Sequence, residues 1–282
     1  MFVCAALIIL LPLLIGLGLY LKSGGLLSSV PLYEVLFSGE WQPWEGKFGL
    51  LPFILSSLWV TILALVIAAP VCLLCAIYLT QYARARLLNF MQPIIDILAG
   101  IPSVIYGVWG ILVIVPLTGD YLAPFFGGAQ NSGYCILSGG IVLAIMIIPF
   151  ILNILIEIFR AIPKELTEAS LSLGATQWET IKYVLLRKAR PGIVSSFGLG
   201  LSRAFGETIA VLMVAGNVAK TPSGVFQAGY PLPALIANNY GEMLSIPMYD
   251  SALMFAALVL FVIVLVFNFL SRVLIVKLER NI

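Results

Sequence analysis

The chain contains 282 residues, of which 61% are hydrophobic and only 10% are charged, and its formal net charge is +2. Apolar runs longer than a soluble core helix needs exclude an ordinary water-soluble domain and indicate an integral membrane protein. The chain has no histidine, which excludes a Ser/His intramembrane hydrolase and an HExxH zinc site.

A hydrocarbon layer about 30 Å thick requires roughly 20 helical residues to cross. Six stretches meet this requirement and predict an all-α membrane protein with six transmembrane helices in one domain, residues 1–282: about 1–21, 51–79, 94–117, 135–157, 191–215 and 251–276. The first stretch lacks a preceding basic region and a small-residue cleavage site. We therefore expect a retained span rather than a signal peptide, and the sequence leaves open whether a cytoplasmic flank precedes it.

The basic residues between the spans predict the orientation. With a cytoplasmic N-terminus, only Lys22, Lys47 and Lys220 lie outside, whereas eleven lie inside: Arg84, Arg86, Arg160, Lys164, Lys182, Arg187, Lys188, Arg190, Arg272, Lys277 and Arg280. This asymmetry predicts that both termini are cytoplasmic, and it accounts for the basic residues without nucleic acid.

Aromatic and sulfur-containing residues mark the first half of the chain. Trp41, Trp44 and Trp59 flank the predicted outer face and are interpreted as interfacial anchors. Cys72 and Cys75 form a CxxC pair, but an apolar helix surrounds it. We therefore interpret them as small packing residues rather than as a redox pair.

The third predicted span contains a carboxylate and two helix-weakening residues. Asp96 follows Pro93 by three residues, so we interpret it as an acid of the first helical turn that offsets the helix dipole. Pro102 and Gly107 are expected to bend this span near its middle.

Residues 158–190 form a polar segment between the fourth and fifth spans. The repeat of Leu166, Ala169, Ser170 and Leu173 predicts a short amphipathic helix that begins near Pro163. Gly174 is expected to end it in a left-handed conformation, and Thr176 with Glu179 has the spacing of a capping box, which opens a second helix through about Lys188. Pro191 is then expected to start the fifth span. Two interpretations remain open: a knob that fills a groove on a cytoplasmic partner, or a helix pair that lies on the membrane surface.

The fifth predicted span carries two opposite charges. Arg203 is expected near the middle of the bilayer, and Glu207 at i+4 would lie on the same helix face. The residues alone leave two alternatives. The pair is either a structural ion pair, or a pathway site in which the Arg203 guanidinium donates to a tetrahedral oxyanion and Glu207 neutralises it when the path is empty.

Small residues surround this pair, and a long external segment follows it. Gly198, Gly200 and Gly206 lie close to Arg203, so we expect packing against a sister subunit first and pore lining second. In the external residues 217–250, the run PLPALIANNYGEM is expected to form a short helix at the mouth.

The polar segment resembles a known signature. Glu168-Ala169-Ser170, then Gly174, then Val184 to Leu186 is similar to the "EAA…G…I-x-L" pattern of permease subunits of ATP-binding-cassette (ABC) importers, except that Arg187 stands where proline is usual. The resemblance implies a type I importer permease whose coupling helices dock into an ATPase, with Glu168, Ala169 and Gly174 in the contact. The chain has no GxxxxGK[ST] loop, so we expect no enzymatic activity or cofactor on it and expect a partner to bind ATP.

Three further segments narrow the resemblance. GIPSVIYGVWG (100–110), RAFGETIAVLMVAGN (203–217) and GYPLPALIANNYGE (229–242) are similar to PstC-type permeases of bacterial phosphate importers. This resemblance implies an inner-membrane protein that works with a PstA-like sister permease, two copies of a PstB-like ATPase and a PstS-like phosphate-binding protein, with Arg203 and Glu207 on the substrate pathway. The binding protein would meet residues 22–49 or 217–250. The alternatives are another oxyanion as substrate, the PstA-type subunit, or a secondary anion transporter.

Overall fold

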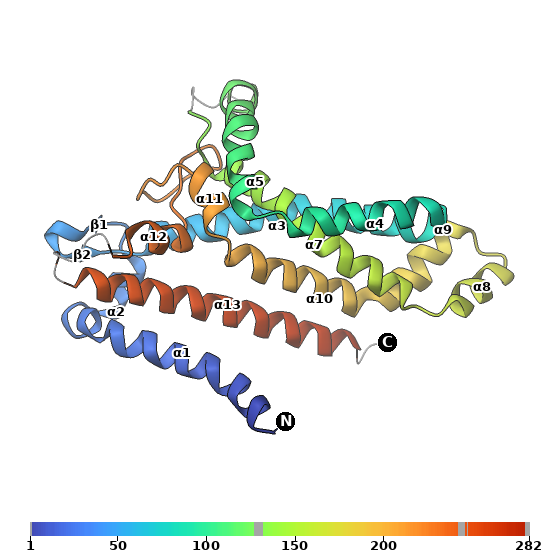
Figure 1. Ribbon diagram of the computed structural model, residues 1–282, viewed down its shortest axis with the longest axis horizontal. Helices are drawn as coiled ribbons and strands as arrows, with labels where there is room; N and C mark the ends of the chain where they lie inside the picture. The colour runs from blue at the N-terminus through green and yellow to red at the C-terminus, as the bar shows by residue number, and fades with distance from the viewer. Residues whose placement is uncertain (1, 127–131, 242–245, 247, 280–282) are drawn as a thin grey trace. The chain divides into compact units, whose positions relative to one another are not determined.

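The computed structural model describes residues 2–126, 132–241, 246 and 248–279, and nearly all of its regular structure is helical (Figure 1). The α-helices are α1 (Phe2–Ser29), α2 (Leu32–Phe37), α3 (Leu51–Ile77), α4 (Ala85–Gly100), α5 (Ser103–Trp109), α6 (Ala123–Phe125), α7 (Ile136–Arg160), α8 (Lys164–Ser172), α9 (Gln177–Glu179), α10 (Leu186–Phe205), α11 (Ile209–Val214), α12 (Leu232–Asn239) and α13 (Tyr249–Glu279). A two-stranded antiparallel hairpin, β1 (Trp41–Gln42) and β2 (Lys47–Phe48), encloses the 3₁₀ turn η1 (Pro43–Glu45). Arg280 and Glu242, which the sequence analysis used, lie outside the described residues.

Several helices contain or adjoin π-helical turns, in which the backbone bonds reach one residue further than in an α-helix. They are η2 (Tyr78–Tyr82), η3 (Gly110–Ile114), η4 (Leu117–Leu122) and η5 (Thr180–Leu185). Such turns are rare and occur mostly as short interruptions of α-helices. The regular 3.6-residue periodicity therefore fails across each of these places.

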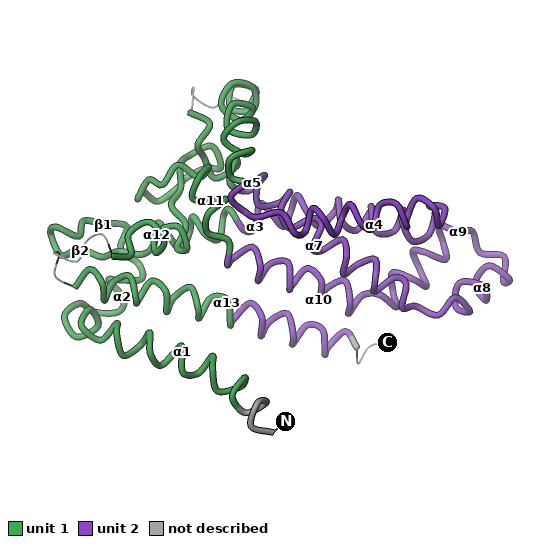
Figure 2. The backbone as a smooth tube through the Cα atoms, viewed as in Figure 1, with its two compact units in different colours: residues 1–60, 107–139, 207–265 green, residues 61–106, 140–206, 266–282 purple. Residues whose placement is uncertain are grey.

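The chain divides into two compact units. Unit 1 contains residues 1–60, 107–139 and 207–265, and unit 2 contains residues 61–106, 140–206 and 266–282 (Figure 2). Each unit is built from segments distant in sequence, because α3, α5, α7 and α13 pass from one unit to the other.

Five helices in the described part of the chain are long and apolar enough to cross a membrane: Leu7–Ser29, Leu51–Tyr82, Ser103–Phe125, Ile136–Arg160 and Tyr249–Leu278. The predicted all-α membrane protein is thus confirmed, while the count of six spans stays a prediction. The third span is shifted from its predicted bounds, because α4 ends at Gly100 and the apolar helix begins only at Ser103, after Pro102. A proline at this point removes a backbone donor and favours a helix boundary.

The predicted fifth span, 191–215, is not one helix. The α10 helix begins at Leu186 and ends at Phe205, with Gly206 as its C-cap, and α11 begins at Ile209. Pro191 therefore lies inside α10 and does not start a span. A new helix begins after the break. The Glu207 carboxylate stabilises its start by accepting the backbone N–H of Ala210 at 3.1 Å, near the N-terminus of α11.

Unit 1 has an aromatic core under its hairpin. The Trp41 ring lies edge-on to Phe53 at a centroid distance of 5.0 Å and to Tyr249 at 6.0 Å. Trp41 is partly buried and packs against the core of unit 1, and its role as an interfacial anchor stays a prediction. Trp44, at the hairpin tip, is 80% exposed, and Trp59 is 40% exposed.

Two buried serines attach the segment that leads into α12 to α3 within unit 1. The Ser57 hydroxyl accepts the backbone N–H of Leu232 at 2.8 Å, and the Ser56 hydroxyl accepts that of Tyr230 at 3.1 Å. These bonds fix the first residues of α12, whose presence confirms the predicted short helix.

Unit 2 is organised around α7, against which α4 and α10 pack (Figure 2). A Cβ atom on Gly200 of α10 would overlap the side chain of Ile151, and one on Gly198 would lie 2.8 Å from the Ser271 hydroxyl of α13. Packing of these two glycines against a sister subunit is therefore wrong, because their neighbours belong to the same chain. A Cβ atom on Gly206 would lie 3.6 Å from the nearest atom, the backbone oxygen of Arg203.

Candidate functional site

The polar segment of unit 2 folds into a helical hairpin at the tip of that unit, beyond the ends of α7 and α10 (Figure 1). The first limb is α8, and Gly174 ends it with φ of +87°, the predicted left-handed conformation. The predicted capping box is confirmed: the Glu179 carboxylate accepts the backbone N–H of Thr176 at 2.8 Å, and the Glu179 N–H donates to the Thr176 hydroxyl at 3.3 Å. The backbone bond from Thr176, followed by its side-chain bond, lowers the pKa of the Glu179 carboxyl.

The hairpin exposes apolar side chains at its end. Leu173 is 90% exposed, and Trp178 and Tyr183 are more than half exposed. The two limbs are joined by a hydrogen bond of 2.9 Å between the hydroxyls of Ser170 and Thr180. Exposed apolar side chains on a compact projection are typical of a surface that another protein covers.

The second limb does not end near Lys188, as the sequence analysis expected. Helical structure runs without interruption from α9 through η5 into α10, and therefore from the hairpin as far as Phe205. Helical structure therefore connects the hairpin to Arg203.

Glu168 and Ala169 lie on α8 and are exposed, whereas Gly174 lies at the turn. Glu168 borders a cavity of about 310 Å³ between α8 and the ends of neighbouring helices; the other lining residues are Thr80, Gln81, Phe159, Arg160, Ile162, Lys164, Thr167 and Leu185. The Gln177 side chain donates to the carbonyl of Gln81 at 2.8 Å, which ties the hairpin to η2. The three predicted coupling residues thus lie on one accessible projection.

Arg203 lies in the last turn of α10 and is exposed. Its guanidinium carbon lies 4.8 Å from the centre of the Phe150 ring of α7, a cation–π distance. Within the described residues, ion pairs join Lys47 to Glu40 and Glu45, and none involves Arg203. The guanidinium therefore keeps its N–H groups available to a ligand or to another subunit.

The predicted i+4 relation between Arg203 and Glu207 is wrong, because α10 ends between them. Glu207 belongs to the start of the next helix, where its carboxylate accepts the Ala210 N–H. The role of either residue on the substrate pathway stays a prediction.

A polar network between α4 and α7 was not predicted from the sequence. The Asn153 side-chain amide donates to the Asp96 carboxylate at 2.7 Å, and its oxygen accepts from the Gln92 amide at 3.3 Å. The interpretation of Asp96 as a first-turn acid is wrong, because α4 begins at Ala85 and Asp96 lies in its C-terminal half. The macrodipole does not stabilise a carboxylate there.

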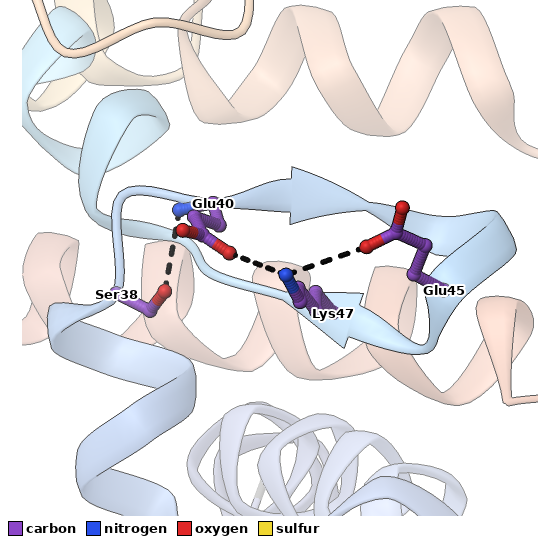
Figure 3. Close-up of polar contacts among 4 residues, drawn as sticks. All are labelled: Ser38, Glu40, Glu45 and Lys47. Atoms are coloured by element: carbon purple, nitrogen blue, oxygen red, sulfur yellow. Dashed lines mark hydrogen bonds and ion pairs between the residues drawn. The ribbon is translucent and has the colours of Figure 1, made fainter.

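The β1–β2 hairpin of unit 1, predicted to be external, carries an ion-pair cluster (Figure 3). The Lys47 ammonium lies 2.8 Å from a Glu40 oxygen and 3.3 Å from a Glu45 oxygen, and the Glu40 N–H donates to the Ser38 hydroxyl at 3.2 Å. The Lys47 hydrogen bond and charge lower the pKa of Glu40, and the Glu40 hydrogen bond contributes most to raising the pKa of Lys47. The three charged side chains are solvent-exposed, so the cluster orients the hairpin more than it stabilises it.

Comparison with known proteins establishes the class of protein. Residues 70–282 match the family model of the binding-protein-dependent transport system inner membrane component, and the chain belongs to this family. The predicted membership of the ABC-importer permeases is thereby confirmed. The chain is therefore a multi-pass membrane protein and a transport subunit.

Individual relatives in this family have more specific names. The chain is 37% identical over 258 residues to phosphate transport system permease protein PstC of Xylella fastidiosa (strain 9a5c), covering 87% of this chain and 79% of the relative. It is 38% identical over 280 residues to the probable ABC transporter permease protein YqgH of Bacillus subtilis (strain 168), covering 97% and 89%. A solved structure of the MetNI methionine ABC transporter in an inward-facing conformation aligns with a TM-score of 0.63 at 20% identity, over 85% of this chain and 99% of that chain, and shows a shared fold.

Proposed function

We propose that this chain is the PstC-type permease of an ATP-driven importer of inorganic phosphate in a bacterial inner membrane, with both termini cytoplasmic. It forms the translocation pathway with a PstA-like sister permease. Two copies of a PstB-like ATPase bind and hydrolyse ATP, and a PstS-like protein delivers phosphate from outside. The similarity to proteins named phosphate transport system permease protein supports the substrate, and the exposed hairpin supports the ATPase contact.

One observation carries the oxyanion assignment: the exposed guanidinium of Arg203, which has no carboxylate partner among the described residues. A guanidinium presents its donors in a planar fork that fits two oxygens of a tetrahedral anion. A charge inside a membrane domain is costly unless it is paired or faces water. An anion in transit would supply the missing partner.

The mechanism follows from the continuous helix. Nucleotide-driven closure of the ATPases moves the exposed hairpin that contains Glu168, Ala169 and Gly174. The motion passes through η5 into α10 and displaces Arg203, which lies in the last turn of that helix. The pathway thereby alternates between inward and outward access.

The test is uptake of radiolabelled phosphate at equal membrane abundance of each variant. Arg203→Lys keeps the charge but loses the planar fork, so we expect uptake to fall at least about tenfold, the factor that 1.4 kcal/mol represents. Arg190→Lys, on the same helix, is the matched control and should retain uptake. Glu207→Gln should preserve the hydrogen bond to Ala210, and hence assembly, while it lowers uptake.

The double change Arg203→Ala with Glu207→Ala separates pathway from structure. Glu207 also accepts the Ala210 N–H, so Glu207→Ala alone is the control for loss of that bond. If the two charges serve only to neutralise each other, the double variant should recover assembly and uptake to the level of that control. Full uptake by this double variant would therefore refute the pathway role. If the unaltered importer does not take up radiolabelled phosphate, the assignment of phosphate as the substrate is refuted.

A further inference from the structure

The network of Asp96, Asn153 and Gln92 lies entirely within unit 2 and joins two helices. Both polar atoms of the Asn153 amide are bonded: its nitrogen donates to Asp96 and its oxygen accepts from Gln92. The Gln92 oxygen is buried and has no partner among the described residues. This geometry fixes the orientation of the Asn153 amide, because exchanging its oxygen and nitrogen would place like groups against both neighbours.

The purpose of this arrangement is not to neutralise Asp96. A neutral amide donates one hydrogen bond to the carboxylate, while Asp96 itself remains exposed and makes no ion pair within the described part of the chain. Asn153 lies seven residues before the end of α7 at Arg160, which places it roughly 10 Å along the helix from that end. A carboxylate at this depth of a membrane domain is a costly feature and calls for a functional explanation.

Asp96 of α4 and Arg203 of α10 contact neighbouring turns of the same helix, α7. Arg203 covers Phe150, and Asp96 is held by Asn153, three residues further along α7. Residues at i and i+3 share one face and are separated by about 4.5 Å of helical rise. Unit 2 thus presents a set of fixed donors and, one turn nearer the predicted cytoplasmic end, a fixed acceptor.

We propose that Asp96 is a specificity residue of the substrate pathway, which accepts a hydrogen bond from the P–OH group of a protonated oxyanion while Arg203 donates to its unprotonated oxygens. This inference rests on the proposed function and specifies the substrate as an oxyanion that retains a proton. Phosphate and arsenate both retain a proton at neutral pH, whereas sulfate retains none. A carboxylate acceptor repels an anion that cannot donate, and a site built around a hydrogen bond strongly rejects an analogue that lacks it.

The experiment measures ligand binding to the permease–ATPase complex without nucleotide or binding protein, so that the selectivity of the binding protein does not enter. Broadening of the ³¹P signal of inorganic phosphate, recorded in a phosphorus-free detergent, detects weak binding. Arsenate should compete with phosphate and abolish the broadening, and sulfate should need at least about tenfold higher concentration to produce the same effect. Equal competition by sulfate and arsenate in the unaltered complex would overturn the proposal, whatever the variants show.

Asp96→Asn supplies the decisive variant. The new amide can accept from Asn153 through its oxygen, which turns its N–H group toward the ligand and replaces an acceptor by a donor. We expect weaker phosphate binding and sulfate competition that approaches that of arsenate. A role of Asp96 in packing alone predicts no such loss of preference. Unchanged discrimination between arsenate and sulfate in an assembled Asp96→Asn complex would therefore also overturn the proposal. Asp120→Asn, an exposed carboxylate of η4, is the matched control and should retain the native preference.

Failure of this inference is distinguishable from failure of the proposed function. If the importer takes up phosphate but its complex produces no competable broadening, the site is wrong and the function stands. If uptake itself is not specific for phosphate, the function is wrong.

Discussion

Replacement of Gly174 by valine tests the coupling hairpin most directly. Gly174 has φ of +87°, and no atom lies within 4 Å of the position that a Cβ would occupy. Steric overlap therefore contributes nothing, and the cost is that of a left-handed backbone, about 1–2 kcal/mol for an ordinary L-residue. The turn relieves this strain by giving up its closing bonds, from the Gly174 N–H to Leu171 at 3.0 Å and from the Ala175 N–H to Ser170 at 3.3 Å.

The expected result is loss of ATPase docking with an intact membrane domain. A cost of this size lowers the ratio of the native to the opened turn by a factor of about 5 to 30, so recovery of ATPase in a pull-down with tagged permease should fall by up to the same factor. The thermal unfolding of the solubilised permease should be unchanged. Gly46→Val is the matched control: Gly46 has φ of +74° and equally open surroundings, but it lies in the external hairpin. Normal ATPase recovery with Gly174→Val would refute the docking role and favour the membrane-surface interpretation.

Three other predictions concern the two units. Ser57→Ala should leave the buried N–H of Leu232 without its acceptor and destabilise the protein by about 1–3 kcal/mol; thermal unfolding should show a lower Tm, whereas Ser172→Ala, on the exposed hairpin, should not. Gly200→Val should force Ile151 out of place and lower the yield of folded permease, whereas Gly206→Ala should be tolerated; size-exclusion chromatography distinguishes the two. In the external hairpin, Glu40 has a lowered pKa, so its contribution to stability is present above its unfolded pKa and should disappear as pH falls through the folded pKa. Hydrogen-exchange protection of the β1–β2 amides, corrected for intrinsic rate, should fall with it, and a pH-independent protection in this range would contradict the ion-pair assignment.

Local signals were sufficient to predict the coupling hairpin. The left-handed Gly174 and the Thr176–Glu179 capping box are decided by residues within one turn of each other, and both formed as expected. Hydropathy likewise predicted an all-helical membrane protein, because the bilayer selects composition over about 20 residues.

Helix breaks and distant contacts were not predictable in this way. A hydropathy window is blind to the break at Gly206, since helices inside membrane proteins can be interrupted wherever neighbouring groups satisfy the backbone, as Glu207 does here. The bond between Asp96 and Asn153 joins residues 57 positions apart, and no local pattern specifies it. The partial burial of Trp41 was not predicted either, because it depends on Phe53 and Tyr249, which approach it only in the fold.

The π-helical turns have a consequence for how the length of this chain can vary. Each one contains a residue more than an α-helical turn of the same rise, so removing a single residue there converts it to an α-helix without moving the two ends apart. A deletion within η3 (Gly110–Ile114) or η5 (Thr180–Leu185) is absorbed locally, whereas the same deletion within α7 rotates every following side chain by about 100°. Homologues one residue shorter are accordingly expected to have lost that residue at these turns.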